Sequence, residues 1–268
     1  MNDVQARLDS RGISLDQVGI KGLRYRIRVV AKNGKHHEGT ATVAMSVNLP
    51  YHQRGTHMSR FLEVFSQHHE NISLETLPKL LADLQTRLHA TNVRVEMAFP
   101  IFLERVAPIT RLKALLDFDC RLIGELSGRD LELTLGVMVP VTSLCPCSKE
   151  ISEYGAHNQR GIVSITVRPT TDAHGNLCQI WLEELIDVAE ASGSSPVYPL
   201  LKRKDEKYTT EMAYENPAFV EDMVRNASLR LQSDPRIACY CVHVENFESI
   251  HNHSAYAMRG WERKLEVA

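Results

Sequence analysis

Residues 25–48, which read YRIRVVAKNGKHHEGTATVAMSVN, predict a β-hairpin. Polar and apolar side chains alternate over residues 25–31 and again over residues 37–48, and both stretches are rich in β-branched residues. Asn33-Gly34 lies between them, and this dipeptide favours the tight turn that joins two antiparallel strands. We therefore expect the fold to begin with two neighbouring strands.

The order of elements around this hairpin repeats once along the chain. In the first half, the apolar patterns predict strands over residues 25–31 and 37–48, helices from 57 and over 73–89, and strands over 93–103 and 112–125. In the second half, they predict strands over 131–141 and 161–168, helices over 179–190 and 217–231, and strands over 236–246 and 255–267. We interpret this order as an α+β fold of two ββααββ units in tandem, each with an antiparallel sheet and paired helices on one face. The expected organisation is an N-terminal arm over residues 1–22, a first unit over 23–128 and a second unit over 129–268.

The composition is that of an ordinary globular protein. Hydrophobic residues make up 43% of the 268 residues, and the 31 Lys and Arg against 33 Asp and Glu leave a net charge of −2. No global positive field would recruit nucleic acid or an anionic membrane, and only 6% of residues are aromatic. Neither a signal peptide nor a run of about 20 apolar residues is present, so we expect a cytoplasmic protein. Six cysteines are too sparse for a disulfide scaffold, which leaves core, metal-binding or catalytic roles.

The loop over residues 142–160, TSLCPCSKEISEYGAHNQR, carries Cys145, Cys147 and His157 between two predicted strands. Thiolate sulfur and imidazole nitrogen are the ligands that zinc prefers. Two cysteines one residue apart do not form the knuckle of a structural zinc finger, so we expect one Cys and one His with a third ligand from elsewhere. Three protein ligands and an open position are typical of a catalytic metal. The other reading is a buried cysteine pair beside an exposed histidine.

Further along the chain, Glu248, His251 and His253 follow an apolar strand. A His-x-His pair beside a carboxylate suits either metal binding or proton transfer near neutral pH, although a solvated polar loop would look the same.

On the predicted helix 217–231, Glu221 flanks the apolar stripe. It is either a carboxylate that grips the N–H edge of a guanine or pterin ring, or an exposed acid in a first helical turn.

A basic run at Lys202, Arg203 and Lys204 precedes Asp205 and Glu206. Clustered cationic side chains suit phosphate groups. Read alone, such a run is more typical of a solvated face, and the two acids would then be surface partners unless one reaches a metal.

Six stretches closely resemble the GTP cyclohydrolase IB family, the FolE2 type. They are PVTSLCPCSKEISEYGAHNQRG at 140–161, PVYPLLKRKDE at 196–206, NPAFVEDMVR at 216–225, ENFESIHNHSA at 245–255, and the weaker VGIKGLRYRI at 18–27 and QRGTHMSRF at 53–61. The resemblance spans nearly the whole chain. It implies the tunnelling fold, with two T-fold units in each chain and a homotetramer whose active sites lie at subunit interfaces.

The resemblance also implies an activity and a set of site residues. Members of the family convert GTP and water to 7,8-dihydroneopterin triphosphate and formate, the entry to tetrahydrofolate. The implied metal ligands are Cys145, His157 and Glu206, holding a divalent ion, with zinc first and manganese or iron as alternatives. Cys147 would contact the substrate, Glu221 would anchor the guanine edge, and Glu248, His251 and His253 would line the pocket, with one histidine as general acid. The candidates for the triphosphate are Lys202, Arg203, Lys204, Arg54 and Arg60.

Two alternatives stay open at this point. One is another tunnelling-fold enzyme that acts on a pterin or purine, such as a dihydroneopterin aldolase or a 7-cyano-7-deazaguanine reductase. The other is a non-catalytic binding module stabilised by zinc, which would unfold when the metal is removed.

Overall fold

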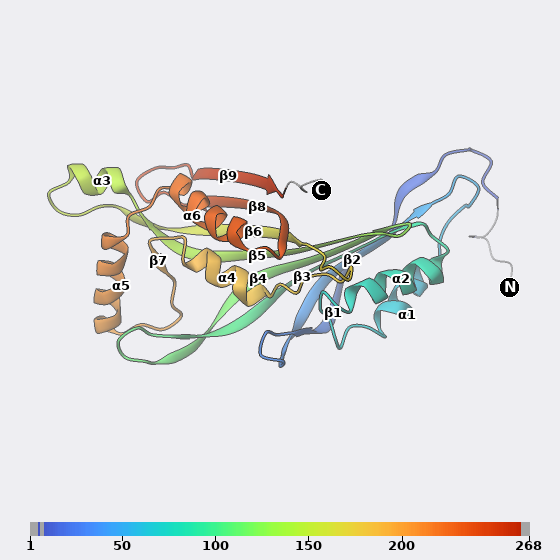
Figure 1. Cartoon of the computed structure of the whole chain (residues 1–268), viewed down its shortest axis with the longest axis horizontal. Coiled ribbons are helices and arrows are strands. Elements are labelled where there is room, and N and C mark those ends of the chain that lie inside the picture. The colour runs from blue at the N-terminus through green and yellow to red at the C-terminus, as the bar shows by residue number, and fades with distance from the viewer. Residues whose placement is uncertain (1–4, 6–7, 264–268) are drawn as a thin grey trace. The chain divides into compact units, whose positions relative to one another are not determined.

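A computed structural model describes residue 5 and residues 8–263, which form a nine-stranded sheet with six helices (Figure 1). The strands are β1 (Leu15–Val30), β2 (His36–Leu49), β3 (Asn92–Val106), β4 (Lys113–Ser127), β5 (Asp130–Leu144), β6 (Asn158–Pro169), β7 (Ser195–Pro196), β8 (Ile237–Asn246) and β9 (Ala255–Glu262). The helices are α1 (Met58–Phe65), α2 (Leu77–Leu88), α3 (Pro146–Ile151), α4 (Leu182–Glu190), α5 (Arg203–Glu215) and α6 (Val220–Ser233). The strands follow the order β1-β2-β3-β4-β5-β6-β8-β9, and β7 pairs with β5.

The first compact unit comprises residues up to 100 together with residues 121–135. Strands β1 and β2 form the predicted hairpin, and Gly34 supplies the positive φ of 76° that its turn requires. Helices α1 and α2 bury their apolar faces, which include Phe61, Leu81 and Leu84. A Cβ on Gly124 of β4 would lie 2.9 Å from Leu81 Cδ1, so this glycine lets the helix approach the sheet closely.

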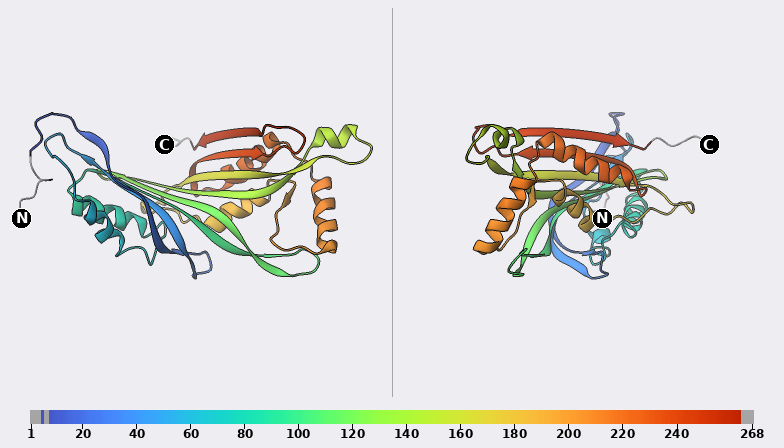
Figure 2. Two further views of the ribbon diagram at one scale, coloured as in Figure 1. Left: turned by 180° about the vertical axis from the view of Figure 1, so that it is seen from behind. Right: turned by 60° about the vertical axis from the view of Figure 1, so that its left-hand side comes forward.

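The second compact unit comprises residues 101–120 and 136–268, of which the last five lie outside the described residues. Its strands β6, β8 and β9 pair antiparallel, and helices α4 and α6 pack on one face of them (Figure 2). The core of the unit includes Ile186 of α4, Met223 of α6 and Val242 of β8. The predicted α+β fold, with antiparallel strands and helices on one side, is therefore confirmed.

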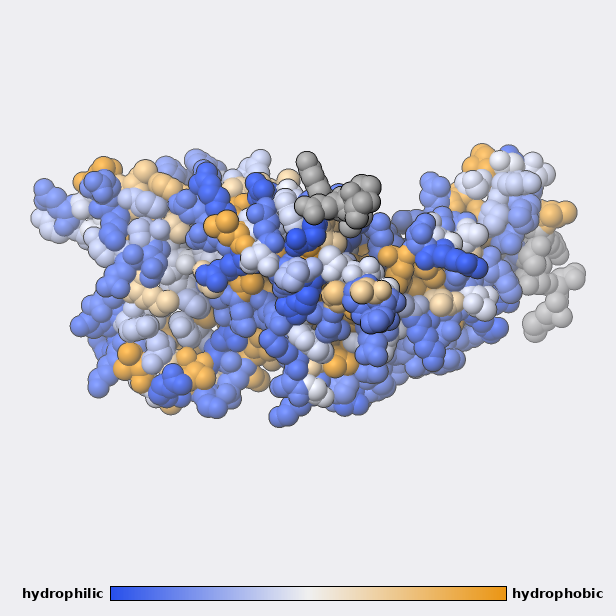
Figure 3. Space-filling model, in the orientation of Figure 1, coloured by the Kyte–Doolittle hydropathy of each residue, from blue (hydrophilic) through white to orange (hydrophobic). Residues whose placement is uncertain are grey.

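Exposed side chains are mainly polar. The face in Figure 3 is largely hydrophilic, with hydrophobic residues in small separate groups. None of the helices within residues 8–263 is long and apolar enough to cross a lipid bilayer.

Several predicted elements start or end elsewhere in the structure. Strand β1 begins at Leu15, ten residues before the predicted start, and none of the side chains in these ten residues is fully buried. Helix α6 begins at Val220 with Phe219 as N-cap, so Pro217 precedes the helix instead of opening it. Helices α3 and α5 were not predicted. The end of the predicted strand 255–267 lies beyond residue 263, outside the described part of the chain.

The predicted boundary between the two T-fold units falls at residues 128 and 129, in the turn between β4 and β5. We keep the division into an arm over residues 1–22 and units over 23–128 and 129–268 as a proposal. The compact units differ from it in that residues 101–120, at the connection of β3 and β4, group with the second unit.

Candidate active site

Cys145 and His157 are brought together by the two ends of the loop between β5 and β6. The backbone N–H of Cys145 donates to the carbonyl oxygen of His157 over 3.1 Å, which closes the loop. Cys145 is also the N-cap of α3, and its Sγ accepts the N–H of Ser148 at 3.4 Å. Pro146 occupies the first helical position, where its missing N–H costs nothing. Cys145 and His157, which carry the predicted sulfur and imidazole, are therefore backbone neighbours across the base of the loop.

The ring of His157 is held by two neighbouring acceptors. Its Nδ1 lies 2.8 Å from Oε1 of Gln159 and 3.7 Å from Oε2 of Glu248. An amide oxygen can only accept, so Nδ1 is the donor of this bond, and Nε2 is the ring nitrogen that the bond does not use. The side chains of His157 and Glu248 are only 14% and 12% exposed. The structure thus places the predicted Glu248 beside the predicted His157.

A buried polar group of three side chains supports this arrangement. Oγ of Ser143 donates to the carbonyl oxygen of Ala218 at 3.0 Å, and accepts Nδ2 of Asn246 at 2.7 Å and Nε2 of Gln159 at 3.4 Å. The group links β5, β6 and β8 to the segment that leads into α6. Sequence reasoning missed these residues. Only Asn246 lies in a predicted strand; Ser143 and Gln159 lie in the predicted loop over residues 142–160, so the sequence pattern did not connect the three.

The basic run and the two acids that follow it form the start of α5. Lys202 is the N-cap, and Arg203, Lys204 and Glu206 are exposed. Asp205 differs from its neighbours because it is fully buried, so it is not the surface acid that the sequence suggested. It accepts the N–H groups of Ile109 (2.9 Å), Thr110 (2.8 Å) and Lys202 (3.0 Å) and the hydroxyl of Thr110 (2.7 Å).

These hydrogen bonds decide the charge state of Asp205. Desolvation by burial would raise the pKa of its carboxyl. The hydrogen bonds from Thr110, Lys202 and Ile109 outweigh that effect and hold the pKa well below its usual range. Asp205 therefore stays ionised and fixes the first turn of α5, which carries Glu206.

The other predicted residues of the second unit are exposed. Glu221 lies in the first turn of α6 and is exposed rather than half-buried. His251 and His253 lie in the loop between β8 and β9 with their rings stacked, 5.0 Å between centroids and 16° between planes. Cys147 is exposed in α3. The structure thus groups Cys145, His157 and Glu248, and leaves Glu206, Glu221 and the stacked histidines accessible to solvent.

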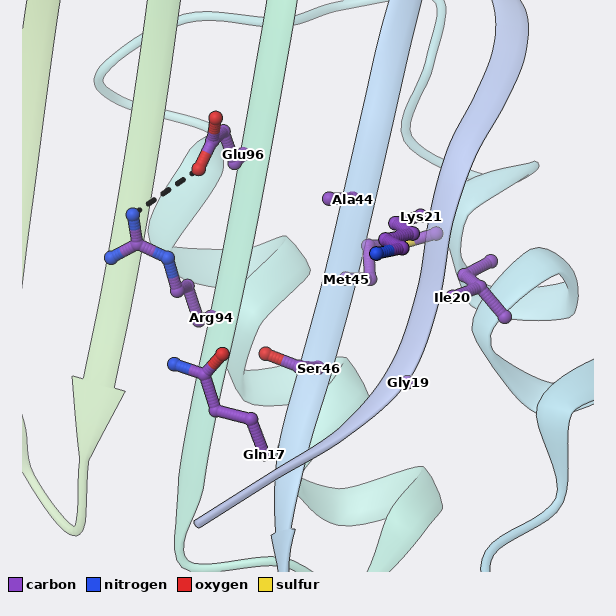
Figure 4. Close-up of a pocket in the computed structure, with 9 residues that line it drawn as sticks. All are labelled: Gln17, Gly19, Ile20, Lys21, Ala44, Met45, Ser46, Arg94 and Glu96. Atoms are coloured by element: carbon purple, nitrogen blue, oxygen red, sulfur yellow. Dashed lines mark hydrogen bonds and ion pairs between the residues drawn. The ribbon is translucent and has the colours of Figure 1, made fainter.

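Two predicted phosphate contacts, Arg54 and Arg60, belong to the first unit. The pocket of that unit drawn in Figure 4 contains neither of them. Its Arg94 forms an ion pair with Glu96 at 3.2 Å and another with Glu125, so its charge is already balanced. We do not assign the predicted chemistry to this pocket.

Sulfur and imidazole fit a divalent metal, and the Nδ1 bond of His157 is the support that metal-binding histidines usually have. Within the described residues, no three His, Cys, Asp or Glu side chains come close enough to hold an ion. Burial raises the pKa of the Cys120 thiol to about 12, which disfavours the thiolate that a metal needs. The backbones of Cys145 and His157 are therefore paired, and the set of metal ligands stays a prediction.

Solved structures with a similar fold are urate oxidases. The uricase of Arthrobacter globiformis matches with a TM-score of 0.55 and 10% identity, covering 95% of this chain and 96% of the uricase chain. Urate oxidase from Bacillus subtilis 168 matches with a TM-score of 0.53 and 8% identity, over 94% of this chain and 99% of that one. At such low identity the likeness concerns the fold alone. The chain has the tunnelling fold, as the resemblance implied.

Sequence comparison identifies the family. Residues 1–257 match the family described as type I GTP cyclohydrolase FolE2. A GTP cyclohydrolase FolE2 from Methylococcus capsulatus is 52% identical over 258 residues, covering 96% of this chain and 94% of the relative. The protein of that name from Nitrosococcus oceani is 49% identical with the same coverage. The chain belongs to the FolE2 family of type I GTP cyclohydrolases.

Proposed function

We propose that this protein hydrolyses GTP at C8 to 7,8-dihydroneopterin triphosphate and formate, the first step of tetrahydrofolate biosynthesis. The observation that carries the proposal is the family match over residues 1–257, which includes every residue predicted for the site. The relatives at about 50% identity are named for this activity and match over nearly their whole length.

The proposed cofactor is one divalent metal held by Cys145, His157 and Glu206, with zinc first and manganese or iron as alternatives. The donor chemistry supports it, because the hydrogen bond to Gln159 leaves Nε2 of His157 free to bind. A bound divalent metal supplies a nucleophile at neutral pH by lowering the pKa of water. Exposed Glu206 stands on a helical turn that buried Asp205 fixes in place.

The remaining residues bind and orient the substrate in this proposal. A carboxylate accepts two hydrogen bonds at once, so Glu221 would hold the N–H edge of guanine and set where C8 lies. His251 or His253 would give a proton to the imidazole nitrogen as the guanine ring opens. Glu248 would hold His157, Cys147 would contact the substrate, and Lys202, Arg203 and Lys204 would meet the triphosphate, with Arg54 and Arg60 as further candidates.

The activity is tested by incubating the purified protein with GTP and a divalent metal, and measuring fluorescent neopterin after oxidation. We expect fluorescence that depends on both GTP and metal. No product with zinc, manganese or iron would contradict the proposal. A nicotinamide-dependent absorbance change with a deazaguanine substrate would point to the reductase instead.

The ligands are tested by metal analysis after dialysis. Cys145→Ala and His157→Ala should each lose the metal, whereas Cys178→Ala, which removes a half-buried thiol elsewhere, should retain it. A full equivalent of metal in either site variant would remove that residue from the ligand set.

Substrate roles are tested by separating kcat from KM. Glu221→Gln should raise KM for GTP about tenfold or more, since it removes a charged hydrogen-bond acceptor. His253→Ala should lower kcat about 100-fold with the metal retained, if this histidine is the acid. An unchanged KM in the first variant, or wild-type turnover in the second, would refute the assignment concerned.

We also propose a cytoplasmic homotetramer with active sites at subunit interfaces. In support, Glu206, Glu221, His251 and His253 are exposed in a single chain. A neighbouring copy could therefore cover them and exclude water from the substrate.

A further inference from the structure

One buried serine hydroxyl in the second compact unit uses all of its hydrogen-bonding capacity. Ser143, near the end of β5, is only 1% exposed. Its Oγ donates to the carbonyl oxygen of Ala218 and accepts hydrogen bonds from Nδ2 of Asn246 and Nε2 of Gln159. A hydroxyl has one proton and two lone pairs, so no donor or acceptor is left for a ligand. The hydroxyl of Ser143 therefore holds neighbouring segments and does not bind substrate.

Two of its partners support the imidazole of His157. Gln159 lies two residues after His157 in the sequence, and its Oε1 accepts the N–H at Nδ1 of that ring over 2.8 Å. Asn246 lies two residues before Glu248, whose Oε2 is 3.7 Å from the same nitrogen. One hydroxyl is thus bonded to a residue that holds the ring directly and to the strand end that leads to Glu248.

The third partner leads to the predicted guanine anchor. The N–H of Ala218 donates to the carbonyl oxygen of Leu144 at 3.1 Å, and its own carbonyl oxygen accepts the hydroxyl of Ser143 at 3.0 Å. Both backbone groups of Ala218 are therefore bonded to the end of β5. Helix α6 begins two residues later, at Val220, and carries Glu221 in its first turn. The start of α6 is consequently fixed to the same strand end as the metal-binding loop.

We propose that Ser143 is a positioning residue that holds the carboxylate of Glu221 in register with the imidazole of His157. This role rests on the proposed function, because it assumes that these two groups bind the guanine base and the metal. Reacting groups must be held within a narrow range of distance and angle, and a misplacement of about 1 Å can cost about 100-fold in rate. A hydroxyl bonded to the supports of both groups meets that requirement.

A second buried serine supplies a matched control. Ser194 is also 1% exposed, and its Oγ accepts the N–H of Leu144 at 3.0 Å. This bond supports the backbone of β5 instead of the side chains of Gln159 and Asn246. Ser143→Ala and Ser194→Ala each remove one buried hydroxyl from the same strand end. Both variants should therefore lower the melting temperature by similar amounts.

The test measures two quantities in each variant, the metal dissociation constant in competition with a chelator and the KM for GTP at saturating metal. Ser143→Ala should raise each of them about threefold to tenfold, the loss expected for one hydrogen bond. Gln159→Leu should weaken metal binding but change KM less than about twofold, because it leaves the bond from Ser143 to Ala218 in place. Ser194→Ala should change both quantities less than about twofold.

Equal shifts in Ser143→Ala and Ser194→Ala would overturn the proposal, since the effect would then be a general loosening of the strand end. A Ser143→Ala variant that changes only one of the two quantities, or neither, would also overturn it. Melting temperatures establish that each variant is folded. If Ser143→Ala does not fold, Ser143→Cys retains the size with a weaker donor and acceptor and should show the same pattern. The metal dissociation constant is measured without GTP, so it tests the link through Gln159 even if the proposed activity fails.

Discussion

The side chain of Gln159 hydrogen-bonds in two directions, to Nδ1 of His157 and to Oγ of Ser143. Gln159→Leu should weaken metal binding by about 10–100-fold, because the histidine loses the partner that fixes its tautomer and ring orientation. The measurement is the metal dissociation constant in competition with a chelator.

Gln159→Glu is the control for this prediction. It keeps an acceptor for Nδ1 of His157, so the loss of affinity should be smaller. If both variants bind metal as tightly as the wild type, the amide has no role in holding the imidazole.

The lowered pKa of Asp205 predicts that the stability of the protein depends on pH. Its pKa is lowered in the folded state, so it binds a proton more readily when unfolded. The stability it contributes is complete above the unfolded pKa of about 4 and is lost progressively as the pH falls below that value. Asp205→Asn should lower the free energy of unfolding at neutral pH, and its difference from the wild type should shrink below about pH 4.

Urea titrations from pH 7 to pH 3 would measure this difference. Glu211→Gln, on the exposed face of the same helix, should leave the pH dependence unchanged. A constant difference between Asp205→Asn and the wild type across this range would contradict the assignment.

At the scale of elements, strands β6 and β8 leave no room for a side chain at one glycine. Gly161 is opposite Asn246, and a Cβ at Gly161 would collide with Oδ1 of that asparagine. Gly161→Ala should therefore cost about 1–3 kcal/mol of unfolding free energy, since buried neighbours must shift. Chemical denaturation measures the loss.

Gly39→Ala in β2 is the matched control, because its Cβ would meet nothing closer than 3.6 Å. It should cost clearly less than Gly161→Ala. Equal costs for the two variants would show that the contact with Asn246 is not what makes Gly161 necessary.

The elements that the sequence predicted are those with an apolar face. Alternation located β2, β3 and β8 to within a few residues, because each buries every second side chain. Helix α5 gave no such signal, since only Asp205 and Ala213 are buried along its 13 residues.

The residues of the candidate site also differ in whether the sequence alone could predict them. The placement of Cys145 and His157 in one loop predicted them as metal ligands, and the structure pairs their backbones. Ser143, Gln159 and Asn246 are common polar residues, and only the folded strands show that they meet. The sequence likewise could not show that Asp205, rather than its neighbour, is the buried acid.

At the scale of the whole molecule, removing the metal distinguishes catalysis from folding. Treatment with a chelator should abolish dihydroneopterin triphosphate formation while circular dichroism and the melting temperature change little. The reason is that both compact units have apolar cores of their own. Unfolding on chelation would instead indicate a structural zinc.

The proposed assembly predicts a mass of about four times 30.3 kDa in light scattering. Activity should fall when dilution separates the chains, in parallel with the mass. Full activity at the mass of a single chain would contradict active sites at subunit interfaces.

Strands β1 and β9 stand at the two ends of the strand order; residues 69–72 hydrogen-bond to β1 at residues 28–30, whereas β9 exposes Tyr256 and Met258. An open strand edge accepts any chain that offers a matching strand. Newly synthesised copies would consequently face a kinetic competition between the proposed assembly and misdirected strand addition. Slower production in the host cell should raise the yield of usable protein.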